Sequence, residues 1–228
     1  MLALHSAVTL TVPTPPIWGG ALKWRCTVNV TDATSAGPAY DFVYEYNSPA
    51  NVSRYELSSG QHDEMCEGQF IGVASYQPCN ITHATDGWSY VEIDGGCCQC
   101  SRLGIVKSDW LEHGANPPVY LGRRVINGVN ASGWQEAGIS ASDNTYFAAA
   151  GLSATPDAPV QFYEHKQVKL KTWDFDLRTY ERSPTFAPGR FDPPAGCNTK
   201  CRGSICRYSA LWCSWMCGGV GEFLSLTV

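Results

Sequence analysis

The stretch Lys23–Thr31 (KWRCTVNVT) decides the fold class, because its side chains alternate between two chemical kinds. One set is apolar and consists of Trp24, Cys26, Val28 and Val30. The intervening positions carry polar or charged side chains, among them Asn29. Successive side chains of a strand point to opposite faces of the sheet, so this period of two predicts a half-buried β-strand. We expect the apolar set to face a core and Asn29 to face solvent.

The same alternation recurs along the chain and predicts an all-β protein. Tyr40–Tyr46 places four aromatic rings on one side of a strand. Helical periodicity is nearly absent, apart from one capped turn expected at Ser108–His113. Nine or ten short strands separated by Gly, Pro, Asn and Asp favour an antiparallel sandwich or open barrel. The further strands are expected at Val52–Leu57, Gln69–Tyr76, Trp88–Ile93, Val119–Val125, Thr145–Ala149, Val160–Leu170 and Thr172–Tyr180.

The last two of these segments differ in the phase of their apolar residues. Val168 and Leu170 are even-numbered, whereas Trp173 and Phe175 are odd-numbered. A shift of one residue sends side chains to the other face of a sheet. Either a bulge or two strands joined by a tight turn near Lys171 explains the change.

The composition excludes some classes of protein. The 228 residues suit one domain, and 44% hydrophobic residues are enough for a sizeable core. The net charge of −5 gives no basic stripe, so we expect no nucleic-acid partner. The chain has no G-x-S-x-G elbow, no H-E-x-x-H and no P-loop. We therefore expect no enzyme and assign no catalytic residue.

Cysteine and asparagine predict the compartment. Eleven cysteines are unusual for a cytosolic protein without a metal. Their spacing suits zinc poorly, because paired C-x₂₋₄-C knuckles a dozen or more residues apart are lacking. We expect disulfides and no metal site, with at least one cysteine unpaired or bonded to another chain because the count is odd. The disulfide candidates are Cys26, Cys66, Cys79, Cys97, Cys98, Cys100, Cys197 and Cys201.

Four Asn-x-Ser/Thr sequons accompany the cysteines. None has proline in the middle, so each is a competent acceptor of an N-linked glycan. Together with the cysteines they predict a secreted protein or one of an organelle lumen. The acceptor residues are Asn29, Asn51, Asn80 and Asn130.

The two ends of the chain differ from the middle, residues 15–201, which we assign to the β domain. Residues 1–14 are either a signal-peptide remnant without its basic leader or the first strand. Residues 202–228 form a cysteine-rich, apolar extension with Glu222 as the only charge from Ala210 onward. A membrane span, a removed lipid-anchor tail and an extension pinned to the domain are the alternatives, and the last is favoured.

An ordered series of short motifs resembles the ependymin-related proteins, especially their divergent protist-type members. The series covers roughly Pro15 to Cys201, and the family's cysteine just before the Pro-Pro-x-Trp motif is missing. Its pieces are Pro15-Pro16-x-Trp18, Thr27–Thr31, Tyr44-x-Tyr46-Asn47, Arg54–Leu57, Trp88-x-Tyr90, Gly96–Cys100, Asp109–Leu111, Gly128…Gly133-Trp134…Gly138, Asn144-x-Tyr146, Pro159-Val160, Trp173–Phe175 and Phe191-x-Pro193-Pro194-x-x-Cys197.

The resemblance implies a secreted glycoprotein with two stacked antiparallel sheets curved around an apolar pocket, like bacterial lipoprotein-carrier domains. It further implies a lipid-like or other hydrophobic ligand, possible homodimers, and calcium as the one conceivable cofactor. For each aromatic assigned to the pocket, taken singly, plain core packing is the favoured explanation. A structural or interaction subunit of a larger extracellular or luminal assembly is the alternative function. The pocket candidates are Phe42, Tyr44, Tyr90, Trp173 and Phe175.

Overall fold

The computed structural model describes residues 12–33, 38–61, 63, 65–67, 76–102, 104–112, 117–136, 144–151, 155–166, 169–203 and 206. Over these residues the protein is all-β, as predicted, with eleven strands and three short 3₁₀ turns. Within the same ranges no helix is long and apolar enough to cross a membrane. The turns are η1 (Trp18–Gly20), η2 (Ser48–Ala50) and η3 (Trp110–Glu112).

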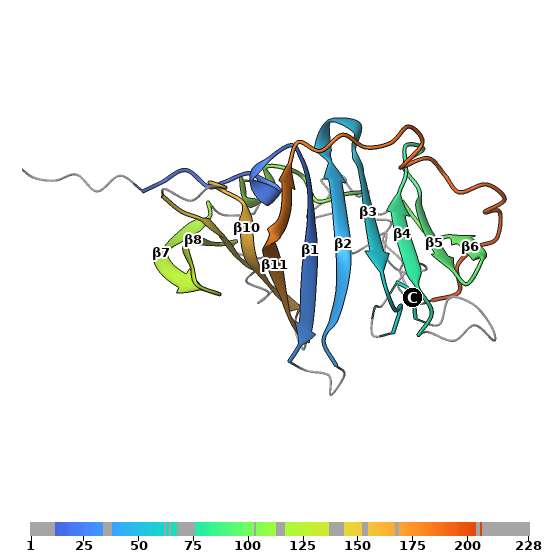
Figure 1. The fold of residues 1–228 in the computed structure, drawn as a ribbon, viewed down its shortest axis with the longest axis horizontal. Helices are drawn as coiled ribbons and strands as arrows, with labels where there is room; N and C mark the ends of the chain where they lie inside the picture. The colour runs from blue at the N-terminus through green and yellow to red at the C-terminus, as the bar shows by residue number, and fades with distance from the viewer. Residues whose placement is uncertain are drawn as a thin grey trace, which may run out of the picture.

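All eleven strands belong to one antiparallel sheet, in the order β6-β5-β4-β3-β2-β1-β11-β10-β9-β8-β7 (Figure 1). Each strand from β1 to β6 pairs with the next one along the chain, and so does each strand from β7 to β11. The pairing of β1 with β11 joins these two halves. The predicted curved, antiparallel architecture is present, with its two parts joined into one continuous sheet. The bounds are β1 Lys23–Asp32, β2 Tyr40–Asn47, β3 Val52–Leu57, β4 Cys79–His83, β5 Ser89–Ile93, β6 Gly96–Gln99, β7 Val119–Ile126, β8 Val129–Gln135, β9 Thr145–Ala149, β10 Pro159–Lys166 and β11 Lys169–Arg182.

The sheet curves around Trp18. The Trp18 ring lies 6.1 Å from that of Trp24 in β1 and 5.4 Å from that of Tyr146 in β9, measured between ring centroids. Strands β1 and β9 are three places apart in the sheet, which is about 14 Å in a flat sheet. One indole contacts both because the sheet bends toward it. We call the face that carries Trp18 the inner face, and the opposite one the outer face.

Strand β1 confirms the prediction from its alternation. Trp24, Cys26, Val28 and Val30 are completely buried on the inner face. Asn29 is exposed on the outer face. Burial of these apolar side chains stabilises the sheet by roughly 1.5–3 kcal/mol for each large one.

Three strands are absent from the sequence prediction: β4, β6 and β8. Strand β8 is rich in small and polar residues (VNASGWQ), and β6 is only four residues long, so neither gives a strong pattern. The turns that precede these two strands are nevertheless recognisable in the sequence: Asn127-Gly128 before β8 and Asp94-Gly95 before β6. All four residues have positive φ, which Asn-Gly and Asp-Gly pairs adopt most easily. Most of the expected strand Gln69–Tyr76 lies outside the described residues.

The expected boundary between two strands is present in the last third of the chain, although Leu170 lies in β11 together with Trp173. Strand β10 ends at Lys166 and β11 begins at Lys169, and the two pair from Gln161↔Asp174 to Lys166↔Lys169. The connection therefore lies a few residues before Lys171. The expected turn of helix at Ser108–His113 is present as η3.

A segment after the last strand runs past the upper ends of β1 and β2 toward β6, and we call residues Ser183–Cys201 the strap (Figure 1, orange). The Arg190 guanidinium contacts carboxylate oxygens of Glu45 in β2 and Glu56 in β3, each at 2.6 Å. Farther along, the amide of Thr85 donates to the carbonyl of Phe191. The strap ends on β6, where Gln99 and Cys201 are joined by a backbone hydrogen bond.

Candidate ligand-binding face

A row of seven side chains, six of them aromatic, crosses the inner face from β2 to β7, and we call it the aromatic row. Cross-strand register places its members directly beside one another, so each touches its neighbours on the same face. All seven belong to the main apolar core, either fully or half buried. In order the row is Tyr40, Val30, Trp173, Phe162, Tyr146, Trp134 and Tyr120.

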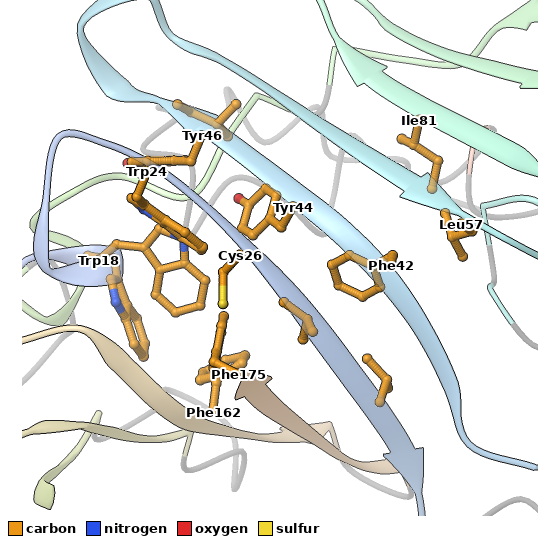
Figure 2. Packing of buried hydrophobic residues seen from close by; sticks show 14 of the residues in the cluster. Trp18, Trp24, Cys26, Phe42, Tyr44, Tyr46, Leu57, Ile81, Phe162 and Phe175 are labelled. Carbon is orange, nitrogen blue, oxygen red and sulfur yellow. The ribbon is translucent and has the colours of Figure 1, made fainter. Parts of the chain in front are cut away.

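Four of the five predicted pocket residues come together here. Phe42, Tyr44 and Phe175 are buried on the inner face, and Trp173 is half buried. The Phe42 ring bridges two of the others, with centroids 6.3 Å from Tyr44 and 5.5 Å from Trp173. Figure 2 shows Phe42, Tyr44 and Phe175 on the same side of β1 and β2.

The assignment of Tyr90 to the same pocket is wrong. In β5 the inner-face residues are Val91 and Ile93, so Tyr90 lies on the outer face. Tyr90 packs with Ala84 and with Cys197, which belongs to the strap. Its hydroxyl donates to Asp86 at 2.6 Å. An aromatic residue alone does not reveal its face; the other strand residue on the Tyr90 side of β5 is Glu92, whereas Val91 and Ile93 share the inner face.

Trp18 occupies the concave side of the sheet, and no sequence pattern assigned it that place. Its ring contacts Trp24, Trp110, Tyr146, Phe162 and Phe175, with centroids between 5.4 and 6.1 Å. Figure 2 shows the Trp18 and Trp24 rings together above Phe162 and Phe175. Most of these contacts are edge to face, which is a favoured geometry for aromatic pairs. The described rings therefore pack against one another at this end of the face.

Backbone geometry at the next residue holds Trp18 in place. Gly19 has φ +68°, and a Cβ there would lie 2.0 Å from the Trp24 indole. Only glycine fits such an approach. The Gly19 amide donates to the Tyr146 hydroxyl at 3.1 Å, and the Tyr180 hydroxyl donates to the Gly19 carbonyl at 2.7 Å.

Several polar atoms on this buried face have no hydrogen-bond partner among the described residues. The indole nitrogens of Trp18, Trp24 and Trp110 are among them, as are the hydroxyls of Tyr44 and Ser53. All five side chains are at most 1% exposed. Buried polar groups are nearly always paired in native proteins, so this face is richer in polar atoms than an ordinary apolar core.

The Tyr44 hydroxyl lies in a strongly desolvated place. Burial is the main cause that raises its pKa well above the ordinary value, and the neighbouring Tyr55 adds to the increase, whereas Trp18 and Ser53 oppose it. The rings of Tyr44 and Tyr55 stack with centroids 4.4 Å apart. Tyr55 is half buried, whereas Tyr44 is fully buried.

Cysteine pairing confirms most, but not all, of the predicted candidates. The bridges are Cys66–Cys79, Cys97–Cys197, Cys98–Cys201 and Cys100–Cys206. The last bridge adds Cys206, and it ties the start of the predicted extension to the end of β6. Cys213 and Cys217 lie outside the described residues. The sulfurs of Cys100, Cys201 and Cys206 are close together, but all three are in disulfides, so no thiolate remains to bind a metal.

The disulfide prediction for Cys26 is wrong. Cys26 forms no bridge within the described part of the chain and is completely buried on the inner face of β1. Its sulfur lies 3.3 Å from the carbonyl oxygen of Asp176. Burial raises the pKa of its thiol to about 12. It belongs to the apolar pattern of the strand, remote from the bridges that anchor the strap on β6.

The four sequon asparagines differ in exposure. Asn29, Asn51 and Asn130 are exposed, whereas Asn80 in β4 is half buried. Exposure is what glycan attachment requires, so the first three remain the stronger predictions.

Two open grooves lie beside the strap. One, of about 820 Å³, is lined by Arg25, Glu45 and Arg190 with Phe186, and the other, of about 630 Å³, by Lys23, Asn47 and the strap itself. Both contain charged or polar side chains. They are therefore different in character from the aromatic inner face.

Comparison with known sequences finds no match, neither a protein-family model nor a curated protein. The resemblance to the ependymin-related proteins therefore stays a prediction.

Solved structures do match, at low sequence identity. An uncharacterized conserved protein from Thermus thermophilus is 11% identical, with 80% of this chain and 91% of that chain covered and a TM-score of 0.48. A LolA superfamily protein from Nitrosomonas europaea is 9% identical (75% and 90% covered, TM-score 0.40). The Mycobacterium tuberculosis lipoprotein LppX is also 9% identical (71% and 88% covered, TM-score 0.40). At such values, function has to be inferred from this chain's own residues.

Proposed function

We propose that this protein is a non-catalytic binding protein that holds a hydrophobic, lipid-like ligand against the inner face of its sheet. The aromatic row across seven strands supplies a long apolar surface of the kind that lines ligand sites. Its half-buried members lie next to the fully buried aromatic cluster. A ligand would reach the buried part from Tyr40, Tyr55 and Trp173, which are all half buried.

The observation that carries this proposal is the set of unpaired polar atoms beneath the apolar surface. An aromatic core that exists only for stability would satisfy its indole and hydroxyl groups or replace them with apolar ones, because an unpaired buried donor costs about 1–3 kcal/mol. Ligand sites, by contrast, combine apolar walls with a few convergent polar groups. The inner face has both properties.

The covalent structure supports our proposal for the compartment. Four disulfides favour an oxidising environment, and sequons with exposed asparagines suit the secretory pathway. We place the protein outside the cell or in an organelle lumen, and assign it no catalytic activity.

Titration with a fluorescent fatty acid tests the proposal. The wild-type protein should bind it saturably, and Trp173→Ala should weaken binding by about tenfold. Trp88→Ala is the matched control, because Trp88 is also half buried but belongs to the outer-face cluster with Tyr90. Absence of saturable binding, or equal weakening by both substitutions, would contradict the proposal.

One observation favours a second function, assembly with a partner chain. Strand β7 is at the edge of the sheet and exposes Val119, Leu121 and Val125. An open edge with exposed apolar residues is a template for pairing with another strand. The other edge strand, β6, is already bonded to the strap. If β7 mediates assembly, Val125→Lys should convert an oligomer to monomer in light scattering, whereas a monomeric wild type rejects this function.

A further inference from the structure

Two of the disulfides lie side by side in the main apolar core, and we call them the inner bridges. They are Cys98–Cys201 and Cys100–Cys206, and all four of their cysteines belong to that core. The sulfurs of Cys100, Cys201 and Cys206 lie within 4.8 Å of one another. The Cys201 sulfur is therefore bonded in one bridge and close to both sulfurs of the other.

A third bridge, Cys97–Cys197, lies on the other side of β6. Both of its cysteines pack in the outer-face cluster with Tyr90, because successive residues of a strand point to opposite faces. Among the described residues no other cysteine sulfur forms such a close group with them. This outer bridge is therefore the control for the other two.

The backbone register brings Cys201 next to a cysteine to which it is not bonded. Lys200 forms a parallel bridge with Gln99, and the amide of Cys201 donates to the carbonyl of Gln99 at 3.0 Å. In a parallel pair the next residues along both chains are neighbours. The register thus places Cys201 beside Cys100, although its disulfide goes to Cys98.

We propose that Cys201 is the centre of a thiol–disulfide exchange that moves its bond from Cys98 to Cys100 and releases Cys206. An external dithiol, of the kind that disulfide oxidoreductases carry, first reduces Cys98–Cys201. The dithiol is oxidised to a disulfide, and each of the two cysteines takes up one electron and one proton. Cys201 then loses its proton, and its thiolate attacks the Cys100 sulfur. The Cys100–Cys201 bond forms, the Cys100–Cys206 bond breaks, and Cys206 leaves as a thiolate that takes up the proton.

The exchange keeps the end of the strap on β6 and frees the residue beyond it. Cys206 is the last described residue, and its disulfide ties it to the end of β6. A reduction at one inner bridge is thereby converted into release of the chain at the other, while the outer bridge stays closed. The inference concerns the covalent structure and does not depend on the proposed ligand.

Partial reduction of the wild-type protein tests the exchange. The folded protein is treated with dithiothreitol until one inner bridge per molecule is lost, then unfolded in acid, labelled with N-ethylmaleimide and mapped by mass spectrometry. Label on both Cys98 and Cys206 is expected in at least about half of the molecules that have lost one inner bridge, because direct reduction of a single native bridge cannot expose this pair. Molecules that have lost the outer bridge should carry the label on Cys97 and Cys197, which is the internal control.

Two matched variants test the exchange without a reductant. Cys98→Ser leaves Cys201 as a thiol beside the other inner bridge, and the label should then appear on Cys206 in at least about threefold excess over Cys201. Cys97→Ser leaves Cys197 as a thiol on the outer face, and the label should stay on Cys197. Circular dichroism confirms that each variant is folded, and the wild-type experiment decides the question if one is not.

The remaining outcomes overturn the inference. If the label appears only on the two cysteines of one native bridge, the inner bridges are reduced independently. If Cys98 is labelled together with Cys100, Cys201 has bonded to the other cysteine of the neighbouring bridge, and the backbone register does not direct the exchange. Label that remains on Cys201 in the folded Cys98→Ser variant likewise shows that no exchange takes place.

Discussion

The indole rings of Trp18 and Trp110 stand edge to face, with centroids 5.9 Å apart and planes at 85°. Each comes from a short turn outside the sheet, and the amide of Trp18 donates to the carbonyl of Ser108, two residues before Trp110. Two loops therefore cover the inner face together. Because both indoles are at most 1% exposed, this contact is part of the core.

Truncation of Trp18 should be among the most destabilising changes in the chain. Trp18→Ala removes a ring that touches five others, and we expect a loss of about 3–5 kcal/mol in the free energy of unfolding. Trp18→Phe keeps one ring and should cost less than half of that. Urea denaturation of the variants measures both values, and a loss below about 1 kcal/mol for Trp18→Ala would show that the loop does not pack as described.

The strap should depend on Arg190. Arg190→Met leaves the carboxylate of Glu45, whose side chain is 4% exposed, with Arg25 at 3.6 Å as its remaining cation. Loss of one partner from a buried pair costs about 3–5 kcal/mol, and the partial exposure of Arg190 reduces our expectation to about 2 kcal/mol. Arg178→Met is the control, because Arg178 pairs with Asp176 at an exposed place. Equal denaturation midpoints for wild type and Arg190→Met would contradict the prediction.

Stability should fall between neutral pH and about pH 4 because of His83. Burial lowers the pKa of His83 from 6.5 to about 4, and its ring nitrogen lies 2.6 Å from the Ser89 hydroxyl. Between these two values the unfolded chain binds a proton that the folded chain does not, so unfolding becomes easier as the pH decreases. The loss is at most about 3 kcal/mol and levels off below the folded pKa. His83→Asn, which does not titrate, should flatten the pH profile of unfolding in this window, and an unchanged slope would refute the assignment.

Glu56 should affect the stability of the protein at lower pH than His83 does. Burial opposes its ionisation, but Arg190 and Arg54 outweigh that effect and lower its pKa below 4.5. A lowered carboxyl pKa contributes stability above the unfolded value, and this stability is lost as the pH decreases through the folded value. In the Glu56→Gln variant the stability should therefore depend less on pH below about 4.5 than in wild type, as measured by acid titration of the circular dichroism signal. An identical acid profile would exclude this role.

Cys26 should resist modification in the folded protein. Its thiol is buried and has a pKa of about 12, so almost no thiolate exists at neutral pH. Iodoacetamide treatment without denaturant, followed by peptide mass mapping, should leave Cys26 unlabelled, whereas treatment in urea should label it fully. Rapid labelling under native conditions would show that β1 opens.

The predictability of this fold from sequence differs between β1 and the loops. Period-two alternation at Lys23–Thr31 correctly assigned both the strand and its buried face, because one face of β1 is apolar and the other polar. In strand β5 Glu92 alternates with Val91 and Ile93, so the period of two places Tyr90 on the face opposite Val91, and its aromatic character alone led to the wrong pocket assignment. Trp18 follows prolines outside any periodic segment, so its place depends on curvature that arises only when β1, β9, β10 and β11 are assembled.

The three bridges from β6 to the end of the strap turn almost half of the chain into a covalent ring. Cys97, Cys98 and Cys100 are bonded to Cys197, Cys201 and Cys206, so everything from β7 to β11 lies between two tied points. A single backbone cut inside that ring leaves both new ends attached to the same molecule. The nicked protein would keep its mass until a reductant opened the bridges. Proteolysis in an oxidising environment could therefore cleave this protein between β7 and β11 without separating the two fragments.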